Sequence, residues 1–163
     1  MLEDRAGSLA ARGGAVTLSS ALVTLSTVEQ RLVRGLTTAL SEAEVSVEQW
    51  RILELVDALA APTMGDLASA SGLAGASLSR TVDALEDEAS VFRLADAADR
   101  RRITVRLSDR GAARLRGVRA IVAAWDADMN RALGSAAIER LGGQLASMSS
   151  ALDAGTAGAV MRE

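Results

Sequence analysis

The sequence predicts a mostly helical protein with one small β-hairpin. Apolar residues recur at three- and four-residue spacing along most of the chain, which is the period of amphipathic helices. Between residues 90 and 107 the period changes to the alternation typical of strands, around a short polar turn. With 163 residues, of which 49% are hydrophobic, the chain can bury a core and has the size of a single domain.

Two helices are expected before Pro62, the only proline. Leucines form one stripe over residues 16–43, which predicts a long amphipathic helix. The second helix begins after Ser46, because Ser46 and Gln49 have the spacing of a capping box, and it ends before the proline. The ends of the chain contain glycine and show little periodicity, so we expect flexible termini.

Two shorter helices follow and are separated by glycine. Thr63 is placed to cap the first of them, and Gly72 supplies the left-handed residue at which such a helix ends. The second takes residues 76–88 and carries Leu78, Val82 and Leu85 on one face. Two short helices joined at a glycine turn predict a helix-turn-helix.

The hairpin and two further helices complete the chain. Strands are expected at 91–94 and 103–107, and the polar turn between them is rich in Arg. A long helix begins after Ser108, and a last one begins after Gly134 and Ser135. Both helices have narrow apolar stripes.

Charge and composition narrow the function. The net charge is −3, yet residues 72–120 carry 10 Arg against 7 acidic residues, and every cation in the chain is Arg. The guanidinium group can bind phosphate or a guanine edge bidentately. The absence of Cys and His excludes thiol and imidazole chemistry, disulfides and nearly every zinc site. We recognise no catalytic constellation, so we expect no enzyme, no metal and no other cofactor.

The sequence also predicts a cytoplasmic protein without a membrane partner. No apolar run approaches the roughly 18 residues that span a bilayer. The chain opens with Glu3 and Asp4, where a signal peptide would carry basic residues.

This order of elements resembles the winged helix-turn-helix of the MarR family of bacterial transcription regulators over about residues 16–148. Three stretches carry the resemblance. They are VEQWRIL at 47–53, the unit from TMGDLA at 63–68 through SRTVDALE at 79–86, and the wing signature of DRR at 99–101 followed by LSDRG at 107–111. The predicted fold is therefore a winged helix-turn-helix with long N- and C-terminal dimerisation helices.

A recognition helix lies in the major groove with its first residues against base edges. The candidates here are Ser77, Ser79, Arg80 and Thr81, where Arg80 can bind a guanine and the hydroxyls can reach phosphates or bases. The alternative for Arg80 is an ion pair with Asp83 on a solvated surface.

The hairpin supplies the remaining candidate DNA contacts. The resemblance assigns Arg101 to the minor groove, whose negative potential attracts Arg, and Asp99 to holding Arg101 in position. It assigns phosphate contacts to Arg93, Arg100 and Arg102. The alternative is a solvated run of charge.

The terminal helices predict a homodimer, because a single chain would leave their apolar stripes uncovered. Residues 22–40 and 121–148 would pair across a twofold axis, and the two recognition helices would read a pseudo-palindromic operator in double-stranded DNA. The predicted parts are a flexible N-terminus (1–14), an N-terminal dimerisation helix (15–45), the DNA-binding lobe (46–108), C-terminal dimerisation helices (109–153) and a flexible C-terminus (154–163).

The resemblance further implies repression that a small aromatic or phenolic effector relieves. Leu22, Trp50 and Arg51 are the candidate residues of the effector crevice, although a core position is the favoured interpretation of Trp50.

The chain departs from the family pattern at the end of the recognition helix. Ala89-Ser90 stands where Gly-Leu is usual, and Asp87 and Glu88 stand where basic residues are common. Ala in a left-handed conformation costs about 1 kcal/mol, and acidic residues oppose the helix dipole there. We therefore expect a loose junction and weaker DNA binding. The alternative function is a protein-interaction module on a winged-helix scaffold with weak or lost DNA binding.

Overall fold

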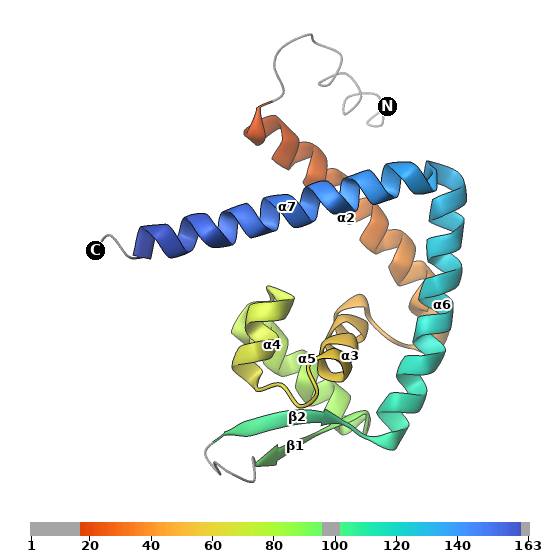
Figure 1. Cartoon of the computed structure of the whole chain (residues 1–163). Helices are drawn as coiled ribbons and strands as arrows, with labels where there is room; N and C mark the ends of the chain where they lie inside the picture. The colour runs from red at the N-terminus through yellow and green to blue at the C-terminus, as the bar shows by residue number, and fades with distance from the viewer. Residues whose placement is uncertain (1–16, 96–101, 161–163) are drawn as a thin grey trace. The chain divides into compact units, whose positions relative to one another are not determined.

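The computed structural model describes residues 17–95 and 102–160, with side chains up to residue 154. The chain forms two compact units that divide between Ile121 and Val122. Figure 1 shows the elements along the chain. They are α2 (Leu18–Leu40), the 3-10 helix η1 (Ser41–Ala43), α3 (Val47–Ala58), α4 (Met64–Ser71), α5 (Gly75–Asp87), β1 (Val91–Ala95), β2 (Ile103–Leu107), α6 (Asp109–Leu133) and α7 (Ser135–Val160).

Capping boxes fix the starts of α3 and α4. Ser46 Oγ accepts from the backbone N–H of Gln49 at 3.0 Å, and Gln49 Oε1 accepts from the backbone N–H of Ser46 at 2.9 Å. Thr63 and Asp66 make the same reciprocal pair, and α4 ends at Gly72 with a φ of 67°. The predicted starts of α3 and α4 and the predicted end of α4 are thus confirmed.

The core of the first unit lies between α3, α4, α5 and the hairpin. Leu78, Val82 and Leu85 point inward from α5, as their spacing predicts. Burial of each such side chain contributes roughly 1.5–3 kcal/mol to folding. The buried cluster consists of Ile52, Leu53, Val56, Leu67, Leu78, Val82, Leu85, Val91, Val105 and Leu115.

The hairpin is joined to the helix-turn-helix along β2. β1 and β2 pair antiparallel with Arg93 opposite Val105, which confirms the predicted strands. The backbone N–H of Val105 donates to the carbonyl of Pro62 at 2.8 Å, and Thr63 bridges to Thr104. The segment between α3 and α4 therefore lies along the outer edge of β2.

The apolar stripe of α2 divides into two parts. Leu36 and Leu40 are buried within the chain, where the end of α2 reaches α3. Leu22 and Leu25, nearer the start of the helix, are exposed. The sequence assigned the whole stripe to a partner copy. Leu36 and Leu40 belong instead to the interior of the protomer, because the chain turns back through η1 and places α3 against them.

The second unit consists of the end of α6 and α7. Between the two helices Gly134 has a φ of 85°, a left-handed conformation that suits glycine. α7 continues to Val160, past residue 153, where the sequence predicts a flexible end. A helical glycine costs only about 1 kcal/mol relative to Ala, so the glycines near this end do not stop the helix. Within residues 17–95 and 102–160, no helix has the length and apolar character needed to cross a membrane.

Candidate nucleic-acid interface

The first half of α5 presents small and polar side chains outward. Leu78 points into the core, while Ser79 and Arg80 are exposed and Ser77 and Thr81 are half-buried. The N-cap residue is Ala74, whose methyl group cannot accept a hydrogen bond. The first N–H groups of the helix are thus left for other acceptors, and phosphate is a favourable one at this positive end of the helix dipole.

Two of these polar side chains contact their own helix. Arg80 Nη2 lies 3.5 Å from Ser77 Oγ, which is the outer limit of a hydrogen bond. The Thr81 hydroxyl donates to the carbonyl of Ser77 at 3.0 Å. Ser79 and Arg80 are therefore the predicted residues of α5 that face solvent most fully.

The second half of α5 is tied to the hairpin through Arg93. Its Nη2 lies 2.6 Å from Asp83 Oδ1, its Nη1 pairs with Glu86, and its backbone N–H donates to Glu86 Oε1 at 3.1 Å. Burial lowers the pKa of Arg93, but the two carboxylates outweigh it, and the pKa lies above its ordinary value. Arg93, a predicted phosphate contact, thus binds Asp83, the residue expected as the alternative partner of Arg80.

The junction after α5 is held by hydrogen bonds. Ala89 has a φ of 54°, so the left-handed conformation expected there is present. Glu88 pairs with Arg114 of α6, and the Ser108 hydroxyl donates to the carbonyl of Ala89 at 2.6 Å. The sequence predicted a loose junction from Ala89, which stands where glycine is usual, and from the acidic Asp87 and Glu88. That expectation did not foresee that Arg93 and Arg114 lie opposite Glu86 and Glu88.

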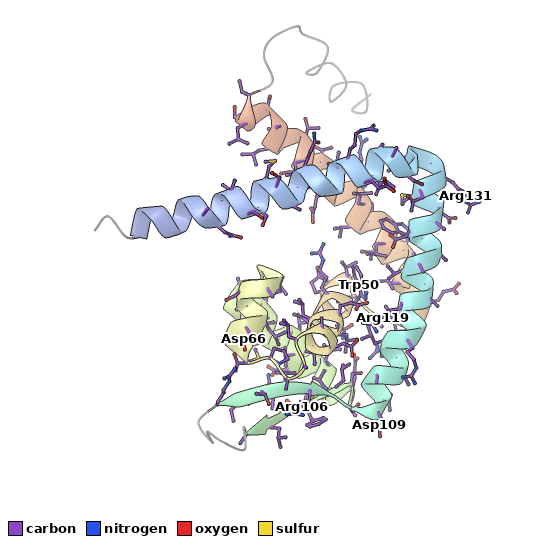
Figure 2. The ribbon with its side chains drawn as sticks, viewed as in Figure 1. Trp50, Asp66, Arg106, Asp109, Arg119 and Arg131 are labelled. Atoms are coloured by element: carbon purple, nitrogen blue, oxygen red, sulfur yellow. The ribbon has the colours of Figure 1, made fainter. Side chains whose placement is uncertain are left out.

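Arg102, one of the predicted phosphate contacts, immediately precedes β2, at the end of the hairpin farther from α6. The side chain is 55% exposed, and its Nη2 lies 3.7 Å from Oδ2 of Asp66. Figure 2 labels Asp66 at the start of α4. Hydrogen bonds from the backbone and hydroxyl of Thr63, and then the charge of Arg102, hold the pKa of Asp66 below its ordinary value. Asp99, Arg100 and Arg101 lie outside the described residues.

Trp50 lies on α3 beside a cluster of charged residues, as Figure 2 shows. Its indole N–H donates to Glu54 Oε1 at 3.2 Å, and the half-buried ring packs against the core. Arg119 of α6 lies 2.6 Å from Glu54 and 2.7 Å from Asp57. Hydrogen bonds to Glu54 and then to Asp57 raise the pKa of Arg119 above its ordinary value. This cluster ties α6 to α3.

The other two predicted effector residues occupy exposed positions. Arg51 lies on the outer face of α3 and Leu22 in the exposed part of α2. Leu22 precedes the buried Leu36 by about 21 Å of helix, at a rise of about 1.5 Å per residue. A concavity of about 560 Å³ lies elsewhere and contains none of the predicted effector residues. Its lining consists of Leu59, Ala60, Ala61, Pro62, Asp66, Ser69, Ala70 and Arg102.

Several residues that shape this surface were not identified from the sequence. Asp66 had a local signal, because Thr63 and Asp66 have the spacing of a capping box. Glu86, Glu88 and Arg114 were not expected to form ion pairs. The two sides of the pair between Glu88 and Arg114 are 26 residues apart, so no helical spacing indicates it.

A family model described as MarR family matches residues 43–102. This span runs from the end of η1 to the residue before β2, and thus covers α3, α4, α5 and β1. No match was found among curated proteins.

Several solved structures have a similar fold. Wild-type apo MarR from E. coli is 22% identical, covers 83% of this chain and 98% of its own, and has a TM-score of 0.69. The transcriptional repressor CouR, bound to a 23-mer DNA duplex, is 23% identical, with coverage of 82% and 92% and a TM-score of 0.74. BpsR from Bordetella bronchiseptica, described as regulated in its DNA binding by 6-hydroxynicotinic acid, is 20% identical, with coverage of 77% and 95% and a TM-score of 0.69. These likenesses show the winged helix-turn-helix fold.

Proposed function

We propose, on the premise that this chain belongs to the MarR family of DNA-binding transcription regulators, that it binds a specific duplex operator and controls transcription from it. In this proposal α5 is the recognition helix and the hairpin is the wing. MarR-family proteins are regulators and not enzymes, in agreement with the expectation from the sequence.

The observation that carries the proposal is the division of charge on α5. Its exposed first half offers Ser79 and Arg80, while Asp83 and Glu86 in the second half are paired with Arg93. Arg93 therefore offsets part of the negative charge by which these two carboxylates would repel a phosphate backbone. Arg102, immediately before β2, adds an exposed guanidinium at the end of the wing farther from α6. In this proposal Ser77, Ser79, Arg80 and Thr81 face bases or phosphates in the major groove.

We further propose a homodimer that reads a pseudo-palindrome. Residues 46–108 would form the DNA-binding lobe, and residues 15–45 and 109–153 the dimerisation helices. Support comes from large apolar side chains that remain exposed on these helices, which a partner copy would cover. They are Leu18, Leu22, Val23, Leu25 and Val28 on α2, Leu133 at the end of α6, and Leu141, Leu145, Met148 and Leu152 on α7.

The regulation we propose is repression relieved by a small aromatic or phenolic acid. The support is the fold shared with CouR, a repressor, and with BpsR, whose DNA binding responds to 6-hydroxynicotinic acid. A ligand that binds the DNA-free form more tightly shifts the population toward it by that difference in affinity.

The test is selection of genomic fragments by the purified full chain, followed by fluorescence anisotropy on a selected duplex. If a dimer makes about 6 to 10 phosphate contacts, affinity should fall by roughly a thousandfold or more between 50 and 200 mM salt. Arg102→Ala should weaken binding to all duplexes and reduce the salt slope by about 1 per protomer.

Arg131→Ala is the matched control, because this arginine is 79% exposed and lies outside the DNA-binding lobe. It should bind like the wild type. A wild-type protein that binds no duplex even at low salt would contradict the proposal and favour the protein-interaction module.

A further inference from the structure

Arg114, in the first part of α6, contacts several separate segments of the DNA-binding unit. Its Nη1 pairs with Glu88 at the end of α5 and lies 3.3 Å from the hydroxyl of Ser90. Its Nη2 donates to the carbonyl of Glu44, before α3, at 2.9 Å. The second carboxylate oxygen of Glu88 accepts from the amide of Gln49, at the start of α3, at 3.0 Å.

The surroundings of this group make the ion pair stronger than an ordinary surface pair. The Arg114 side chain is 21% exposed, and Ser90 is fully buried. Partly buried charges are less screened by water and salt than exposed ones, and a partner left alone loses its hydrogen bonds without regaining full solvation.

Close to the ion pair, the backbone of α6 packs tightly against the backbone at Ser90. A Cβ atom added at Gly111 would lie 1.8 Å from the carbonyl oxygen of Ser90, so α6 and the start of β1 are in direct backbone contact. The Ser108 hydroxyl accepts from the N–H of Gly111 at 2.9 Å, which caps α6 at the same point. α6 is therefore closely packed against the segment that follows α5. The side chain of Arg114 is the flexible part of this contact.

We infer that Arg114 is a positioning residue for DNA reading, which transmits the position of α6 to the recognition helix through Glu88. The inference rests on the proposed function. Arg114 would raise DNA affinity without touching DNA, because its guanidinium is already bound by Glu88 and Glu44. A residue of this kind makes DNA binding depend on the placement of α6, which continues into the second unit of the chain.

The test is a double-mutant cycle in the full chain with Arg114→Gln, Glu88→Gln and the double variant. Dissociation constants for a selected duplex are measured by anisotropy at several salt concentrations, at a temperature where circular dichroism shows each variant folded. We expect each single variant to bind about tenfold more weakly, and the double variant to bind no more weakly than either, because both remove one interaction. The slope of affinity against salt should equal that of the wild type.

Arg116→Gln is the control on the same helix, since this arginine is exposed, and it should leave affinity unchanged. Arg114→Lys should recover part of the affinity by restoring the charge. If Arg114→Gln fails to fold, Glu88→Gln carries the same test, because Glu88 is the other partner in the ion pair.

Each other outcome overturns the inference in a distinct way. Wild-type affinity in folded Arg114→Gln would show that α5 does not depend on this contact. A reduced slope of affinity against salt would indicate that Arg114 contacts phosphate. Additive losses of DNA affinity in the double variant would show that Arg114 and Glu88 act independently on DNA binding. A wild type that binds no duplex would overturn the proposed function itself.

Discussion

The two halves of α5 differ in how their polar and charged side chains are held. In the first half Arg80 makes a contact at the outer limit of a hydrogen bond, and Ser79 is exposed. In the second half Asp83, Glu86 and Glu88 are bound to arginines from β1 and α6. The net charge of a helix is therefore a poor guide to whether it binds DNA, because the charged side chains of one half can form ion pairs within the protein.

The largest expected change in stability comes from disrupting the backbone contact between α6 and Ser90, which follows the second half of α5. Gly111→Ala places a methyl group against the carbonyl of Ser90 and should lower the free energy of unfolding by about 3 kcal/mol. Urea denaturation measures this change. Gly117→Ala, on the same helix with open space around it, should instead stabilise by about 0.5–1 kcal/mol. Equal effects of the two substitutions would mean that α6 does not contact β1 as described.

The next effect is on the exposed half. Arg80→Ala should cost about 1–3 kcal/mol of DNA-binding free energy and relax sequence preference at one base pair of each half-site. The free energy of unfolding should stay within about 0.5 kcal/mol of the wild type, because the side chain is exposed. Anisotropy on duplexes with single substitutions tests both statements. Unchanged preference at every position would remove Arg80 from base reading.

A smaller change in stability is expected from Arg93, which joins the second half of α5 to β1. Arg93→Gln leaves Asp83 and Glu86 without their counter-charge, and should lower unfolding free energy by about 1 kcal/mol, a modest value because the group is partly exposed. DNA affinity should fall with the salt slope unchanged. Asp87→Asn, exposed on the same turn, should change stability by less than about 0.5 kcal/mol. A lower slope of DNA affinity against salt concentration, with unchanged stability, would instead indicate that Arg93 contacts phosphate.

The left-handed residue after α5 gives a smaller effect with the opposite sign. Ala89→Gly removes the strain of a positive φ and should stabilise the protein by about 0.5–1 kcal/mol. Ala113→Gly, at an exposed helical position in α6, should destabilise by about 1 kcal/mol. Thermal unfolding distinguishes the two signs, and destabilisation by Ala89→Gly would argue against the left-handed conformation.

The smallest effect is the pH dependence of Asp66. Its pKa in the folded protein lies below the ordinary value of 3.8, so ionised Asp66 stabilises the fold near neutral pH. This contribution is lost as the pH falls below 3.8 and through the folded pKa. Asp66→Asn should therefore be less stable than the wild type at pH 7, and the difference should shrink in acid. A difference that is constant with pH would contradict this role.

Local signals in the sequence predicted the fold well. The capping box of Ser46 and Gln49, the Thr63 cap and the glycine at 72 each act within a few residues, so a single stretch of sequence contains them. The burial of Leu36 and Leu40 was not predicted, because a stripe of leucines does not say whether its own chain or a partner covers it.

The candidate site was predictable only for its exposed residues. Ser79, Arg80 and Arg102 are exposed in the structure, as DNA contacts must be, and their contact with DNA stays a prediction. The pairs of Glu88 with Arg114 and of Asp83 with Arg93 form only after α6 and β1 pack against α5. Ion pairs of this kind follow from tertiary structure and have no sequence spacing of their own.

The most direct test of this division compares backbone amide chemical shifts of the full chain with and without a selected duplex. Residues 75–81 should show the largest changes within α5, because that half faces the DNA. Residues 83–88 should change less, since the carboxylates of Asp83, Glu86 and Glu88 remain bound to Arg93 and Arg114. Larger changes over 83–88 than over 75–81, or no change along α5 on saturation with DNA, would contradict the account.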